Sequence, residues 1–189
     1  MRFIRLNMDI LVNDKIIEFD KNDFPMLING QAFVNSGASF FSVSLMTKLT
    51  QMGKKVVFFT GFPPAKELFR EQIKNSKSDN IMIIDSGNED VFINNLDEIK
   101  DLKERIILFK NIEEYSSKLF NKLKDHEFII FSGDIDQCVF KKELLKIDFK
   151  NKIFFSYPKN IEMSNKLKLP KYSGHIIGNK NGIIKLKLN

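Results

Sequence analysis

Short apolar runs, each followed by a more polar stretch, recur along the chain and predict strands that alternate with helices. The apolar runs are residues 25–30, 55–60, 80–85, 105–109, 128–132 and 152–156. Continuous runs of this kind are typical of strands buried on both faces of a parallel sheet. Helices are predicted between and after them, at residues 38–52, 64–74, within 90–103, and at 113–124, 141–146 and 161–167. This alternation predicts βαβ units around a mainly parallel sheet.

Both ends of the chain show a different pattern, which predicts two β-hairpins. Residues 2–12 alternate apolar and polar positions, and a turn at 13–15 leads to a second short strand at 16–19. Later, strands at 175–177 and 183–188 flank Asn181-Gly182, a pair that favours a tight hairpin turn. The predicted fold class is a three-layer α/β sandwich that forms one domain over residues 1–189, with an N-terminal and a C-terminal hairpin.

The helix predicted at residues 38–52 follows directly on a loop, at 31–37, that leaves a buried strand. Phe41, Leu45, Leu49 and Met52 form its apolar stripe. Gly53 is placed to end it. A strand, a short loop and an amphipathic helix in this order create an anion site, because loop N–H groups and the positive helix end point the same way.

The amino-acid sequence of this loop matches a known phosphate-binding pattern at every fixed position except one. That pattern has a small residue, four residues of any kind and then Gly-Lys-Ser/Thr. Here Ala32, Gly37 and Ser39 match, and Ala38 holds the lysine position. The chain therefore resembles the P-loop NTPases. The resemblance implies ATP and Mg²⁺ as ligands, with Ser39 on the metal. The nucleotide-binding residues that it implies are Asn35, Ser36, Gly37, Ala38, Ser39 and Phe40. Another doubly wound fold with a generic turn here, Rossmann-like or flavodoxin-like, stays open.

The family also places an acid for Mg²⁺ at the end of a buried strand, and two strands compete for that role. Residues 80–84 are followed by Asp85, a direct match. Alternatively, residues 105–109 form this strand, as in RecA-like and conjugation-type motor ATPases. The acid position would then hold Lys110, with Asn111 beside it. In that case Asp134 and Asp136 follow the next strand. Asp85 and Asp134 are the candidate catalytic residues; Asp85 is the candidate second metal ligand. All three aspartates also fit ordinary loop or turn positions.

These residues predict an ATP-binding domain in which hydrolysis is impaired or absent, because no lysine is present to neutralise charge on the transferring phosphoryl group. The alanine at position 38 would be natural or a designed Lys-to-Ala change. The alternative is a pseudo-ATPase that serves as a structural or loader subunit without binding nucleotide. Whether the chain is an enzyme stays open. RecA-like domains often build their sites between subunits, so a protein partner or a homo-oligomer is expected.

Charge and composition bear on the partners and the cellular location of the protein. The net charge is +6, and the segment 150–189, from Lys150 to Asn189, alone has nine Lys and one Glu. Such a segment is either a nucleic-acid contact or a solvated lysine-rich face. The single cysteine, Cys138, excludes a disulfide within the chain. Apolar runs are too short to span a membrane, and the first residues lack a continuous apolar stretch, so a cytoplasmic location is expected.

Overall fold

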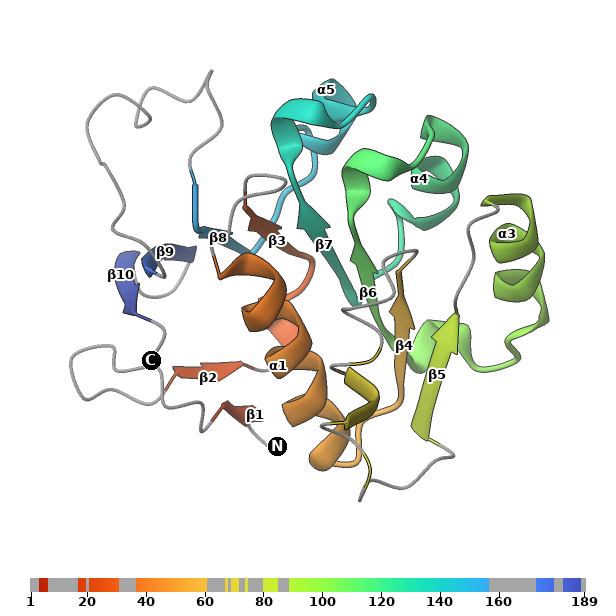
Figure 1. Ribbon diagram of the computed structural model, residues 1–189, viewed down its shortest axis with the longest axis horizontal. Helices are drawn as coiled ribbons and strands as arrows, with labels where there is room; N and C mark the ends of the chain where they lie inside the picture. Colours follow the sequence, from red (N-terminus) through yellow and green to blue (C-terminus); the bar gives the residue numbers. More distant parts are fainter. Residues whose placement is uncertain are drawn as a thin grey trace.

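A mainly parallel sheet forms the centre of the computed structural model (Figure 1). The structure describes residues 4–6, 17–19, 21–30, 37–60, 67, 69–71, 74, 80–84, 89–156, 173–178 and 182–187. Within these, eight strands form one sheet in the order β10-β9-β8-β3-β7-β6-β4-β5. Its parallel strands are β3 (Met26–Asn29), β4 (Val56–Phe59), β5 (Ile81–Ile84), β6 (Ile106–Lys110), β7 (Ile129–Gly133) and β8 (Asn151–Phe154).

Two antiparallel hairpins accompany these strands, as the sequence predicts. The hairpin of β9 (Ser173–Gly178) and β10 (Gly182–Lys187) pairs with β8 and so extends the sheet at one edge. The hairpin of β1 (Ile4–Leu6) and β2 (Ile17–Phe19) forms a separate two-stranded sheet. The predicted α/β class and both hairpins are therefore confirmed.

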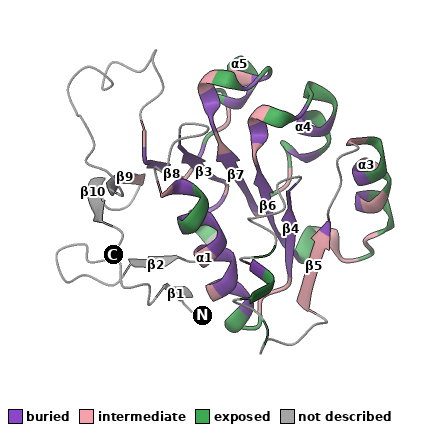
Figure 2. Cartoon of the chain, viewed as in Figure 1, coloured by how far each residue is buried: buried purple, intermediate pink, exposed green. Residues whose placement is uncertain are grey.

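Helices cover both faces of the sheet and produce three layers. One apolar cluster joins α1 (Ala38–Gln51) to strand residues such as Ile28, Leu108 and Ile130. The opposite cluster joins α3 (Glu89–Glu98), α4 (Ser117–Leu123) and α5 (Lys141–Leu144) to the other face. Short 3-10 turns complete the described elements: η1 (Lys21–Asp23), η3 (Leu102–Glu104), η4 (Ile112–Glu114) and η5 (Ile135–Gln137). Figure 2 shows the central strands β3, β7, β6 and β4 buried between helices whose outer sides are exposed, whereas the edge strand β5 is only partly buried.

One predicted helix, at residues 113–124, is wrong in its boundaries. Asn111 adopts a left-handed conformation with φ 62°, the 3-10 turn η4 follows, and Tyr115 is extended. The helix α4 begins only at Ser117, where the Ser116 side chain accepts a hydrogen bond from Lys118 N. A serine at this position caps a new helix start, and that signal outweighs the apolar periodicity that runs through it.

Several predicted features lie outside the described residues: most of the phosphate loop with Asn35 and Ser36, the position of Asp85, and the helix at 161–167. No described helix has the length and apolar character that crossing a bilayer requires.

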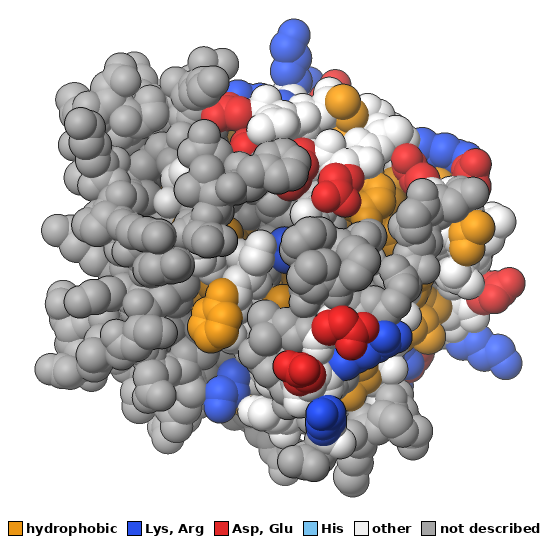
Figure 3. All heavy atoms as spheres, in the orientation of Figure 1, with side chains coloured by type: hydrophobic (Ala, Val, Ile, Leu, Met, Phe, Trp, Pro, Cys, Tyr) orange, Lys and Arg blue, Asp and Glu red, His pale blue; other side chains and the backbone are white. Residues whose placement is uncertain are grey.

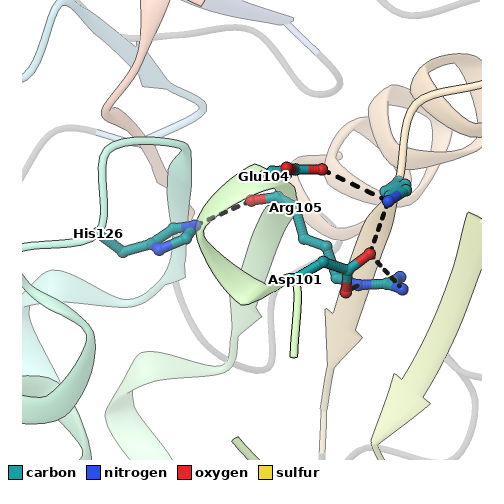
Figure 4. A network of polar contacts seen from close by, with 5 residues as sticks. Asp101, Glu104, Arg105 and His126 are labelled. Carbon is teal, nitrogen blue, oxygen red and sulfur yellow. Dashed lines mark hydrogen bonds and ion pairs between the residues drawn. The ribbon is translucent and has the colours of Figure 1, made fainter. Parts of the chain in front are cut away.

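The amino-terminal edge of the sheet is held by an ion cluster that links the segments before β4 and β6 (Figure 4). Asp101 accepts hydrogen bonds from Arg105 Nε at 2.7 Å and from Lys55 Nζ at 2.7 Å. The Arg105 and Lys55 hydrogen bonds lower the pKa of Asp101 to about 2. Next to them, His126 Nε2 donates to the carbonyl oxygen of Arg105 over 2.8 Å.

Replacing Asp101 by Asn should lower the melting temperature at pH 7, and the difference from the wild type should vanish in acid. The folded pKa lies below the ordinary value of 3.8, so the stabilisation is present above about pH 4 and is lost as pH falls toward 2. Thermal unfolding at a series of pH values measures this. The exposed Asp125, replaced by Asn, is the control. A difference for Asp101→Asn that stays constant from pH 7 to pH 2 would contradict the ion cluster.

Candidate functional site at the carboxyl edge of the sheet

The carboxyl ends of the parallel strands meet at the upper edge of the sheet in Figure 1, and α1 begins at the same edge. The strand register aligns three residues there: Ile28 of β3 lies opposite Ser132 of β7, and Ser132 lies opposite Lys110 of β6. Side chains alternate between the faces of a sheet. Ile28, Leu108 and Ile130 belong to the α1 cluster, so Ser132 and Lys110 also face α1.

The first turns of α1 contact this row at Ser132. Ser132 Oγ donates to Ser42 Oγ at 3.3 Å, and Ser42 Oγ donates to the carbonyl oxygen of Ala38 at 2.8 Å. These contacts connect β7 to the helix start. The sequence-predicted residue Ala38 is buried, whereas Ser39 and Phe40 are exposed.

The start of α1 has no negative group of its own. Gly37 precedes the helix with φ 93° and ψ −12°, a left-handed conformation that favours glycine. As the residue before the helix, Gly37 has no side chain that could cap this end, and no acid lies in the first turn. The helix dipole therefore leaves partial positive charge at Gly37, Ala38 and Ser39, as an anion site requires.

Lys110 ends β6 as a buried cation. Only 3% of the surface of Lys110 is exposed to solvent. The ammonium donates one hydrogen bond, to Asn111 Oδ1 at 3.2 Å, and forms no ion pair with a carboxylate in the described part of the chain. Burial lowers the pKa of Lys110, while the charges of Glu113 and Glu114 act in the opposite direction. A buried ammonium that meets a neutral amide instead of a carboxylate is unusual, because desolvation of a charge is costly.

Asn111 turns the chain away from β6 and connects Lys110 to an acid. Its side chain accepts from Lys110 Nζ and donates through Nδ2 to Glu114 Oε1 at 3.2 Å. Burial, followed by the charge of Glu113, raises the pKa of Glu114. Left-handed non-glycine residues cluster at functional sites. The turn after β6 thus contains a lysine, an amide and a carboxyl group in one chain of contacts.

Asp134, a candidate catalytic residue in the sequence, occupies a turn. Its Oδ1 accepts from Asp136 N at 3.0 Å, and its own N–H donates to Glu113 Oε2 at 2.9 Å. Asp136 pairs with Lys141 at 2.6 Å. These contacts match the turn interpretation of both aspartates and assign them to the corner after β7.

Asn29, which the sequence analysis did not single out, ties three strand ends together. Its Oδ1 accepts from Ile135 N at 3.0 Å, and its Nδ2 donates to the carbonyl oxygen of Ser156 at 2.6 Å. The next residue, Gly30, donates its N–H to the carbonyl oxygen of Gly133 at 3.1 Å. The only signal in the sequence was a lone amide at the end of an apolar run. In the structure, Asn29 fixes the end of β3, from which the following loop departs.

The two strands proposed for the metal-binding acid lie at different distances from β3. Only β7 separates β6 from β3, about 10 Å at the usual strand spacing. In contrast, β4, β6 and β7 all separate β5 from β3, about 19 Å. Asp85 itself lies outside the described residues, just after Ile84 at the end of β5.

Metal-ligand and thiol chemistry gain no support from the described residues. They contain no group of three or more His, Cys, Asp or Glu side chains placed to hold a metal ion. Cys138 is buried, and burial raises its pKa to about 12. A thiol with that pKa stays protonated and unreactive at neutral pH.

Comparison with solved structures identifies the fold. EssC (ATPases 2 and 3) from Geobacillus thermodenitrificans matches with a TM-score of 0.64 and 12% identity, over 98% of this chain and 40% of that one. B204, the DNA-packaging ATPase from Sulfolobus turreted icosahedral virus, matches with a TM-score of 0.60 and 13% identity, over 87% and 97%. The flagellar accessory protein FlaH from Methanocaldococcus jannaschii matches with 0.52 and 12%, over 87% and 84%. The fold is that of the P-loop ATPases.

The likeness is one of fold alone. No family model matches the chain, and no curated protein matches it. The chain spans about two-fifths of the EssC structure. At this level of identity the chemistry has to come from the chain's own residues.

Replacing Gly133 by Ala should destabilise the carboxyl edge by about 1–3 kcal/mol. A Cβ atom there would lie 2.1 Å from Glu113 Oε2 and 2.8 Å from Ile112 N. Chemical denaturation measures the change. Gly53→Ala is the matched control, because Gly53 also has positive φ but nothing within 4 Å of its Cβ position. Equal losses for the two variants would show that the contact with Glu113 is unimportant.

Replacing Lys110 by Met should stabilise the free protein by about 1–4 kcal/mol at pH 7, because it removes a buried charge and keeps the volume. The folded pKa of Lys110 lies below 10.5, so the unfolded chain binds more protons and the penalty fades as pH rises toward 10.5. Denaturation between pH 7 and pH 10 should show the gain shrinking. The exposed Lys103, replaced by Met, is the control. A loss of stability in Lys110→Met would mean that the ammonium is fully compensated.

Proposed function

We propose that this chain is a P-loop ATPase-like domain that does not hydrolyse ATP efficiently. The observation that carries the proposal is the buried cation of Lys110 at the end of β6, combined with an alanine at position 38. Each replaces a residue whose charge ATP hydrolysis requires.

The first change removes a positive charge. In the phosphate-loop pattern, the lysine before Ser39 reaches the β- and γ-phosphates. Ala38 has only a methyl group, which is buried in the first turn of α1. Loss of one preorganised charge from a transition state costs about 2.7–4 kcal/mol, a factor of roughly 10²–10³ in rate.

The second change adds a positive charge where a carboxylate would hold magnesium. The spacing of strand ends favours β6 over β5 as the strand that carries this position. An ammonium repels a divalent cation, and the nearby carboxylates are already engaged: Glu113 accepts from Asp134 N, and Glu114 accepts from Asn111. The described side chains at this edge do not fit Mg²⁺, so we propose no step that uses the metal.

In the alternative proposal, the chain is a structural or loader subunit that binds no nucleotide. Both proposals predict that ATP is not hydrolysed efficiently, and they differ only in whether nucleotide binds. In either form the domain would act through a protein partner or a second copy of itself.

Contact with nucleic acid through residues 150–189 remains a prediction, because most of that segment lies outside the described residues. On the face drawn in Figure 3, acidic and basic side chains of the described residues are mixed and form no patch of one sign.

Phosphate release from ATP with Mg²⁺ tests the proposal. The wild-type chain should show no turnover above the blank, and the double variant Ala38→Lys/Lys110→Asp should gain activity by at least tenfold over the detection limit. A gain from Ala38→Lys alone would instead indicate that only the lysine is missing and that the rest of the site is intact. Turnover by the wild type near 1 s⁻¹, an ordinary enzyme rate, would refute the proposal.

A further inference from the structure

Strand β5 ends the sheet on one side, and β4 is its only strand neighbour in the described part of the chain (Figure 1). The strand is not shortened at this edge, because β5 has four residues, as β3, β4 and β8 do. Successive residues of a strand direct their N–H and C=O groups to opposite sides. Every second residue of β5 therefore presents backbone donors and acceptors on the side away from β4.

The side chains of β5 leave apolar surface uncovered on both faces of the sheet. Ile81 and Ile83 pack against the α1 cluster, and Met82 packs against the cluster on the opposite face. All three are only partly buried, whereas the residues of the neighbouring strand β4 are fully buried (Figure 2). Both apolar layers therefore extend to the edge of the sheet and end there in contact with solvent.

The two edge strands of the sheet differ in charge. At one edge, β10 contains Lys185 and Lys187, and proteins commonly use lysine to keep an edge strand from pairing with another chain. At the other edge, residues 81–84 contain no charged residue and no proline. An uncharged strand lies beside a copy of itself without opposing like charges. The edge formed by β5 is therefore suited to accept another strand.

Helix α3 continues the apolar surface past β5. Asp90 and Asp97 form ion pairs with α4, and the buried Phe92 contacts Phe59 of β4. Because successive residues of a helix are about 100° apart, Val91 points to the side of α3 that faces away from α4. That side is the β5 side of the molecule in Figure 1. Val91 is 50% exposed, so a second apolar group flanks the open strand.

We propose that the outer edge of β5 pairs with β5 of a second copy of this chain, so that the two sheets become one. The two strands run antiparallel about a two-fold axis perpendicular to the sheet, because this symmetry places equivalent faces on the same side and keeps both apolar layers continuous. A residue in the middle of the strand, Met82 or Ile83, then lies opposite itself. The flanking side chains of residues 81–84 meet apolar partners, and Val91 of each copy is turned toward the other.

The inference goes beyond the proposed function and is independent of it. Strands β4, β6 and β7 separate β5 from β3, and the pairing involves no nucleotide. The occupant is a second copy because the strand is complementary to itself: its four residues are apolar, and the symmetric pair repeats the same contacts on both sides of the axis.

Sedimentation velocity at a series of protein concentrations tests the pairing. The wild-type chain, with a mass of 22.0 kDa, should shift to twice that mass with a Kd of about 1–100 μM, as expected for a small interface. Met82→Lys should raise Kd by roughly tenfold or more, because the symmetric interface contains the new charge twice. Val91→Lys should also raise Kd. Val139→Lys makes the same change at another exposed valine and is the control.

A disulfide between copies tests the register. Either Met82→Cys or Ile83→Cys should form a covalent dimer under mild oxidation by dissolved oxygen. Directly opposed residues of an antiparallel pair have Cα atoms about 4.5–5.5 Å apart, which is within reach of a disulfide. The native Cys138 is buried and does not compete. Val139→Cys, the control, should stay monomeric under the same conditions.

Three results would overturn the inference: a wild type that is monomeric at every concentration, a dimer whose Kd neither Met82→Lys nor Val91→Lys changes, or no disulfide at either position of β5. The first and third would leave this edge to an extended segment of a different protein. Thermal unfolding of each variant at low concentration checks that it folds, and Val91→Lys changes only an exposed side chain. ATP turnover by the wild type would refute the proposed function without bearing on this dimer, and a monomeric wild type would do the reverse.

Discussion

The parallel register of β3, β7 and β6 is the constraint on which the rest of this structure depends. Because the strands run the same way, their carboxyl ends and the start of α1 meet at one edge. The register alone brings Ile28, Ser132 and Lys110 into one row, although more than 80 positions separate the first from the last. A shift of one residue along β6 would turn Lys110 to the opposite face, into the cluster of Phe109 and Phe131.

A buried ammonium at that edge is costly, and the surrounding contacts offset the cost only in part. Asn111 supplies one acceptor, while Glu113 and Glu114 lie close enough to act on the pKa of Lys110 without pairing with it. Groups that are buried at the expense of stability concentrate at functional sites. The same reasoning separates Lys110 from Asp101 at the opposite edge, where two cations satisfy one carboxylate and the pKa moves in the direction of a structural ion cluster.

The hydrophobic pattern was enough to predict the layered α/β fold, because strands buried on both faces read as uninterrupted apolar runs. It failed at residues 113–124, where the left-handed Asn111 and the cap at Ser116 divide one predicted helix into a turn and a shorter helix. The sequence pattern also did not indicate Asn29, because its structural role comes from contacts with Ile135 and Ser156, which lie more than 100 residues away in sequence. Local patterns contain no information about such partners.

For the site, the sequence by itself determined the residue types: a glycine and a serine around an alanine at the start of α1, an aspartate after residues 80–84 and a lysine after residues 105–109. It left two strands open as the second half of the site. The tertiary structure gave these strands different distances from β3, because strand order is set by long-range pairing in the sheet: β6 lies one strand closer to β3 than β4 does and two strands closer than β5 does. Only packing could show that Lys110 is buried on the α1 face of the sheet and forms no ion pair with a carboxylate among the described residues.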